Sequence, residues 1–160
     1  MLQKGVTLIQ LVVLIIVLLI IVSFAIFSVD NITDESIIAR EYESLKEVKI
    51  GVDQTLNLIE MNPEKYKEEE KFVDNISGKK DEYYSRIGLD SASELSDRSY
   101  LINSENQDKL EINKILEERS YVVDLENEKY YIVDGVQRKG KERIYEYSDI
   151  SREFNLLSNQ

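Results

Sequence analysis

Carboxylates are the only side chains abundant enough in this sequence to suggest acid–base or metal chemistry. The chain has 31 Asp and Glu among 160 residues, but no His and no Cys. This composition removes the commonest general base, the commonest metal ligand, disulfides and every Ser/His or Cys/His nucleophile pair. No glycine-rich phosphate-binding fingerprint is present. Because no catalytic pair can be singled out among so many acids, we expect no enzymatic activity and no cofactor.

One acidic group could be imagined as a calcium loop. Asp90, Glu94 and Asp97 lie close together in a polar stretch. Their spacing lacks the order of an EF-hand loop, in which alternate positions supply the oxygen ligands. The sequence therefore predicts a solvated surface segment here and no metal site.

The charges are distributed unevenly along the chain. All acids lie at or after Asp30, and the only base before that point is Lys4. The segment from residue 30 to residue 160 thus carries 19 bases and 31 acids, a net charge of 19 − 31 = −12. Such a domain is repelled by phosphate backbones, so we expect no nucleic-acid partner for it as a whole. A local basic group is interpreted as an ordinary solvated turn: Arg138, Lys139, Lys141 and Arg143.

The N-terminal segment is apolar and long. Residues 6–29 contain no charge, and 24 residues of helix at about 1.5 Å each can cross a hydrocarbon core of about 30 Å. Lys4 before the segment and Asp30 after it place the N-terminus in the cytoplasm and the acidic domain outside. A cleaved secretory signal would be shorter and would end in small residues, unlike the sequence around Phe27. A plain single-pass membrane anchor fits the hydropathy well.

The residues at the front edge of this segment indicate a third interpretation. Lys4 and Gly5 precede Val6-Thr7-Leu8-Ile9-Gln10-Leu11, an order that resembles the prepilin signal of type IV pilins and pseudopilins. The resemblance implies that a prepilin peptidase cuts between Gly5 and Val6 and that Val6 is then N-methylated. It also implies an assembly role for the residues that follow: Thr7, Leu8, Ile9, Gln10 and Leu11.

The sequence departs from the family at several positions. Val6 replaces the usual Phe, while Leu19 and Phe27 stand where major pilins often have Gly and Pro. Gln10 replaces a nearly invariant Glu, whose carboxylate is thought to pair with a neighbouring subunit's N-terminal ammonium. Gln10 can accept a hydrogen bond but cannot neutralise that charge, and it costs less to bury unpaired. The resemblance therefore favours a minor pilin or pseudopilin, and a tip position would suit it; sequence drift is the alternative.

Beyond residue 30 the apolar residues continue in a helical pattern. They recur at steps of three and four, and Pro63 provides a stop, so the helix should end near residues 60–62. A continuous helix of about residues 6–60 would be roughly 80 Å long, although residues 30–33 could cap a new helix instead. The predicted buried stripe is Ile38, Tyr42, Leu45, Val48, Val52, Leu56 and Ile59. The other faces are predicted to carry Glu41, Glu43, Lys46, Glu47 and Asp53.

The sequence pattern of the C-terminal part predicts a small α+β domain. A short helix is plausible at 105–118. Residues 121–125 and 129–133 are rich in aromatic and β-branched residues and predict a hairpin, with Asn127 at a possible left-handed position. A third strand is expected at 143–147, after turns near Gly135 and Gly140.

These predictions give an α+β, pilin-like ladle, in which a small antiparallel sheet packs on the second half of the long helix. Its parts would be a leader (1–5), a transmembrane or filament-core helix (6–29), an amphipathic helix (30–62) and a globular head (63–160). The resemblance implies a subunit that acts by assembly or adhesion. Its expected partners are other pilin subunits, the prepilin peptidase and the cytoplasmic membrane, with a pilus or pseudopilus as its final location. The alternative is a single-pass anchored extracytoplasmic binding or sensor protein.

Overall fold

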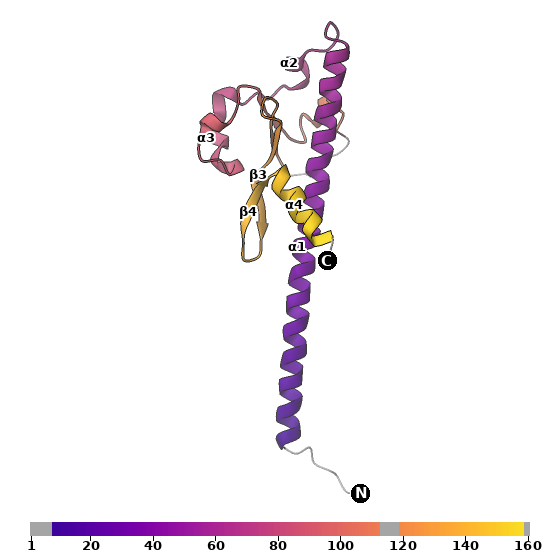
Figure 1. Ribbon diagram of the computed structural model, residues 1–160, viewed down its shortest axis with the longest axis vertical. Helices are drawn as coiled ribbons and strands as arrows, with labels where there is room; N and C mark the ends of the chain where they lie inside the picture. Colours follow the sequence, from indigo (N-terminus) through magenta and orange to yellow (C-terminus); the bar gives the residue numbers. More distant parts are fainter. Residues whose placement is uncertain (1–7, 113–118, 159–160) are drawn as a thin grey trace.

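The computed structural model describes the backbone of residues 8–112 and 119–158, and their side chains except those of residues 8–11 and 23–33. It confirms the α+β prediction: one long helix, α1 (Leu8–Met61), carries a four-stranded antiparallel sheet on its second half. The first half of α1 extends beyond the head as a bare rod (Figure 1).

Helix α1 ends where the sequence predicts. Its last residue, Met61, lies two positions before Pro63, and the backbone stays helical through residues 30–33. The predicted stripe faces the core, and four of its seven residues have no exposed surface: Ile38, Leu45, Val48 and Val52. The other three are partly buried against the same core: Tyr42, Leu56 and Ile59. One expected position is wrong, because Glu41 does not face solvent but is completely buried.

The sheet has the order β1-β2-β3-β4, with every neighbouring pair antiparallel. The strands are β1 (Ser99–Ile102), β2 (Tyr121–Asp124), β3 (Lys129–Arg138) and β4 (Lys141–Glu146). The predicted β2–β3 hairpin is confirmed, but Glu128 and not Asn127 takes the left-handed conformation, with φ 55°. Asn127 is held elsewhere, because its backbone N–H and side-chain amide both donate to the Asp124 carboxylate. Strand β1 was not predicted.

The turn expected near Gly135 does not exist. Strand β3 continues through Asp134 (φ 63°) and Gly135 (φ 59°), where the register with β4 shifts. These two left-handed residues form a bulge that bends the strand without ending it. The turn at Gly140 is confirmed, and β4 begins immediately after it, two residues before the predicted start of the third strand.

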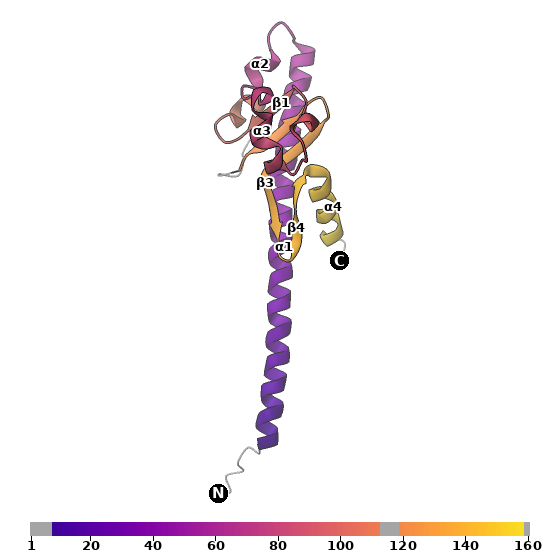
Figure 2. The ribbon, with the colours of Figure 1, turned by 90° about the vertical axis from the view of Figure 1, so that its left-hand side faces the viewer.

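A C-terminal helix that was not predicted, α4 (Tyr147–Ser158), packs against α1 (Figure 2). The ring of Tyr42 on α1 stacks on both Tyr147 and Phe154 of α4, with centroids 5.9 Å and 4.4 Å apart. The helix expected at 105–118 is reduced to a 3-10 turn, η4 (Gln107–Leu110); residues 113–118 lie outside the described part.

The connection from α1 to β1 is made of short turns. It contains α2 (Glu68–Lys71) and α3 (Lys80–Tyr83), together with the 3-10 turns η1 (Ser77–Lys79), η2 (Ser85–Ile87) and η3 (Ala92–Glu94). This connection covers the face of the sheet opposite α1, so the head has three layers (Figure 1).

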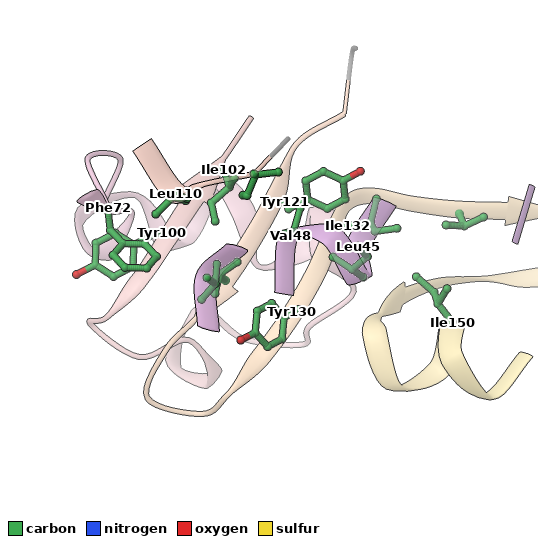
Figure 3. Close-up of a cluster of buried hydrophobic side chains, with 14 of the residues drawn as sticks. Leu45, Val48, Phe72, Tyr100, Ile102, Leu110, Tyr121, Tyr130, Ile132 and Ile150 are labelled. Carbon is green, nitrogen blue, oxygen red and sulfur yellow. The ribbon is translucent and has the colours of Figure 1, made fainter. Parts of the chain in front are cut away.

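Alternate residues of the strands fill the spaces between these layers. Tyr121 and Val123 of β2 point toward α1 and join the larger core, whereas Val122 joins a second core under the connection. In β3, Ile132 belongs to the larger core and Tyr131 to the second. Figure 3 shows side chains of the larger core arising from α1, the sheet and α4. Among the side chains that the structure describes, those of α1 that join the apolar interior of the head all lie in its second half, from Ile37 onward.

Candidate assembly surface

The first half of α1 has an apolar surface on all its sides. Every residue from Val12 to Val22 is aliphatic, and each side chain is 46% to 62% exposed. A helix that packs on one core has an apolar stripe and a polar face, whereas a helix that is apolar all round needs an apolar environment all round. This stretch is therefore the candidate assembly surface of the molecule.

The residues that the sequence singled out lie at the beginning of this surface. Gly5, Val6 and Thr7 are outside the described residues. Leu8, Ile9, Gln10 and Leu11 belong to the first turns of α1, but their side chains are also outside the description. The processing and assembly roles of these seven residues stay predictions. Within the part of the chain that the structure describes, no helix is long and apolar enough to cross a membrane.

A buried ion pair fixes the head to α1. Glu41 Oε1 accepts hydrogen bonds from Arg119 Nε (3.1 Å) and from its terminal nitrogen (2.6 Å). Glu41 has no exposed surface, and among the described residues its Oε2 has no hydrogen-bond partner. Arg119 lies two residues before the start of β2, so the pair joins the sheet to the helix. Sequence reasoning missed it because the two residues are 78 positions apart.

A second polar contact reinforces this attachment. The hydroxyls of Ser44 on α1 and Tyr121 on β2 are 2.5 Å apart and buried. Burial raises the pKa of the Tyr121 hydroxyl to about 12, although the hydrogen bond with Ser44 acts in the opposite direction. Tyr121 therefore stays neutral at physiological pH and serves as a structural group.

The three acids considered as a calcium loop, Asp90, Glu94 and Asp97, are engaged in other contacts. Glu94 Oε1 accepts the backbone N–H groups of Asp90 and Ser91, each at 3.0 Å, as part of a capping box at η3. Asp97 instead pairs with Lys80 at 2.7 Å. Within the described ranges, no three His, Cys, Asp or Glu side chains are placed to hold a metal ion.

The basic residues near the β3–β4 turn are not simply solvated, contrary to the sequence interpretation. Arg138 is only 8% exposed, pairs with Glu153 of α4 at 3.0 Å and donates to the Glu142 carbonyl at 2.9 Å. Arg143 donates to Gln137 Oε1 and to the Asp134 carbonyl. Lys141 also lies 3.8 Å from Glu153, so Arg138, Arg143 and Lys141 are all bound to the hairpin or to α4.

Comparison with known proteins gives no assignment. No family model matches the chain, and no curated protein or solved structure matches it significantly.

Proposed function

We propose that the chain is a minor subunit of a type IV pilus or a related pseudopilus. A prepilin peptidase processes it between Gly5 and Val6, and it acts by assembly or adhesion and not by catalysis. Before assembly the first half of α1 spans the cytoplasmic membrane with the head on the outer side, and afterwards the same half packs against other pilin subunits. The ladle shape, a rod with a head on its second half, is consistent with this proposal.

The observation that carries the proposal is the exposed apolar surface from Val12 to Val22 beside a head that is already complete. Burial of one aliphatic side chain contributes roughly 1.5 to 3 kcal/mol, so this surface strongly favours transfer from water into lipid or a helical bundle. The head does not provide that environment for Val12–Val22, because none of these side chains belongs to its core. A rod of this kind suits a molecule that exchanges a bilayer for a filament.

The sequence order at the front of the rod supports a pilin over a simple anchor. Lys4-Gly5 followed by Val6 places the expected cleavage before the apolar segment, so the segment stays attached to the head. Gln10 in place of the family's Glu supports a minor role, because an amide is a weaker partner than a carboxylate for an ammonium.

Mass spectrometry of the chain from membrane and sheared surface fractions tests the proposal. In cells that have a prepilin peptidase, we expect a mature chain that begins at N-methylated Val6. Gly5→Leu should block cleavage and leave the leader attached, whereas Gln3→Leu should be processed normally. An intact Met1 in the wild-type membrane fraction would instead support the single-pass binding or sensor protein.

A further inference from the structure

A cavity of about 390 Å³ lies at the foot of the head. It is enclosed by three elements that the fold brings together there: the middle of α1, the tip of the β3–β4 hairpin and the C-terminal end of α4. Figures 1 and 2 show the hairpin tip and the end of α4 at the level where the bare half of α1 leaves the head. The backbone N–H of Lys139 donates to Asp34 Oδ1 at 3.3 Å, which fixes the hairpin tip at this level on α1.

The walls of the cavity carry charges of both signs over an apolar base. The lining consists of three bases, three acids and two aliphatic residues: Arg138, Lys139, Lys141, Asp34, Glu35, Glu153, Ile38 and Leu157. Arg138 is 8% exposed, and its Nε is buried with no hydrogen-bond partner among the described residues. The rest of its guanidinium is held in place, because it pairs with Glu153 at 3.0 Å and donates to the Glu142 carbonyl at 2.9 Å. Lys141 also lies 3.8 Å from Glu153, so both bases are fixed on the wall of the cavity.

The height of the cavity identifies the ligand class, and this step rests on the proposed function. Asp34 lies five residues after Val29, the last residue of the uncharged segment, so it stands about 7 Å above the hydrocarbon edge. A bilayer of 40–45 Å with a 30 Å core has about 5 to 7 Å of headgroup on each side. The cavity thus opens at the level of the phosphates and amines of the outer leaflet.

We propose that this cavity binds the headgroup of a zwitterionic amine phospholipid of the phosphatidylethanolamine type. Lys139 and Lys141 bind the phosphate, and the buried guanidinium of Arg138 adds positive charge behind them. Glu35 and Asp34 bind the ammonium. Ile38 and Leu157 line the apolar base of the site. The balance of three bases and three acids favours a zwitterion over a purely anionic headgroup, which the net charge of the acidic head would repel. The site would hold the head upright on the membrane until the subunit leaves for the filament.

The test uses the full-length chain in nanodiscs and counts retained lipids by native mass spectrometry. The discs contain phosphatidylcholine with an equal small fraction of phosphatidylethanolamine or phosphatidylglycerol. We expect retention of phosphatidylethanolamine over both other lipids, and an approximately tenfold loss of that preference in the Lys139→Gln/Lys141→Gln variant. The matched control Lys65→Gln/Lys67→Gln removes the same charge at the opposite end of the head and should behave as wild type.

Equal retention of the three lipids by the wild-type chain would overturn the site. So would an unchanged preference in the Lys139/Lys141 variant, or tighter binding of soluble phosphoethanolamine than of the lipid. Loss of filament incorporation in that variant without any lipid preference in the wild type would also overturn it and assign the hairpin to a subunit contact. Processing at Val6 is measured on the same samples, so a failed lipid site remains distinguishable from a failed pilin proposal.

Discussion

A fully buried carboxylate on α1 fixes the orientation of the head on this helix. Glu41 lies three residues after Ile38 and four before Leu45, so its helical position falls on the apolar stripe itself. A lone charge there would oppose folding, and the paired Arg119, with 27% of its side chain exposed, compensates for it. The contact specifies one orientation of the sheet on the rod, which an apolar pair would specify less strictly.

Removal of one partner of this pair should destabilise the head strongly. We expect Arg119→Met to lower the free energy of unfolding by about 3 kcal/mol, because it leaves the buried Glu41 with only the exposed Arg40 guanidinium, 3.5 Å away, as a cation. Glu41→Gln should cost less, since a neutral amide can still accept from Arg119. Urea unfolding of the detergent-solubilised chain at neutral pH measures both.

The control is Arg40→Met, whose guanidinium is 63% exposed and 3.5 Å from the same carboxylate. It should change the free energy of unfolding by no more than about 0.5 kcal/mol. If Arg40→Met and Arg119→Met lower the free energy of unfolding equally, the Glu41–Arg119 pair does not contribute more to stability than the exposed contact with Arg40.

Asp124 should make the unfolding free energy of the head depend on pH in the acidic range. Burial acts to raise the pKa of Asp124, but the hydrogen bonds from Ser96 and Asn127 outweigh it and lower this pKa below its ordinary value. A pKa lowered on folding adds stability above the unfolded value of about 3.9, and this stability is lost as the pH falls through the folded value. Asp124→Asn should remove this part of the acid sensitivity.

Unfolding free energies of wild type, Asp124→Asn and Ser96→Ala, measured from neutral pH to about pH 3, check this. Ser96→Ala removes one hydroxyl donor to Asp124 and should lower stability at neutral pH while flattening the acid limb. The difference in unfolding free energy between wild type and Asp124→Asn reports this group alone. If that difference stays constant from neutral pH to about pH 3, the sign of the Asp124 pKa shift is wrong.

At the scale of elements, the parts with local signals could be predicted. Pro63 marks the end of α1, and the aromatic and β-branched runs mark the β2–β3 hairpin. Strand β1 is four residues long and forms only because β2 lies beside it, so no local pattern indicates it. Helix α4 does have a local signal, since Ile150, Phe154 and Leu157 recur at steps of four and three.

The candidate site divides in the same way. The apolar character of Val12–Val22 can be predicted from the sequence alone. Its exposure can be predicted as well, provided that the head has a core of its own. The Glu41–Arg119 pair and the cavity at the foot of the head could not be predicted, because each joins residues more than 70 positions apart. Such contacts depend on the complete topology, so no short stretch of sequence indicates them.

Two glycines hold η2 and the β3 bulge against the ring of Tyr145. A Cβ built on Gly135 would lie 2.7 Å from that ring, and one on Gly88 would lie closer still; both residues have positive φ. We expect Gly88→Ala and Gly135→Ala each to lower the free energy of unfolding by about 3 kcal/mol, through backbone strain plus the clash.

Two other glycines separate these causes. Gly140 has φ 67° but open space around its Cβ position, so Gly140→Ala should cost only the strain, about 1 kcal/mol. Gly78 has neither constraint, and Gly78→Ala should be neutral or slightly stabilising. Thermal or urea unfolding of the four variants checks the order; a loss at Gly140 as large as at Gly135 would remove the role of Tyr145.

At the scale of the whole molecule, the chain is a rod whose two halves meet different environments. The second half of α1 is an ordinary core helix, with the sheet on one side and α4 beside it. In the first half, the described side chains from Val12 to Val22 are apolar and exposed, and none of them belongs to the core of the head. Folding of the head and burial of the rod are therefore separate events, and substitutions in the rod should affect only the second.

A charge in the middle of the rod should uncouple these events. We expect Ile16→Asp to abolish recovery in the membrane and filament fractions, because a carboxylate costs roughly 2.5 to 3.5 kcal/mol at the centre of a membrane helix. The melting temperature of the head in detergent should be unchanged, and Ile16→Leu should behave as wild type in both assays. A fall in the melting temperature for Ile16→Asp would show that the rod contributes to the fold of the head.

Substitutions of Gln10 test whether a charge interaction holds the long helices of neighbouring subunits in axial register. If neighbouring subunits present an N-terminal ammonium to this position, Gln10→Glu replaces a neutral hydrogen bond by a charge-assisted one and should raise the amount of subunit in sheared filaments. Gln10→Leu has no acceptor and should lower it. Both variants should still be cut before Val6, which the mass of the mature chain shows. Equal incorporation of Gln, Glu and Leu variants would mean that apolar packing along Val12–Val22 is sufficient for assembly and that residue 10 has no special part in it.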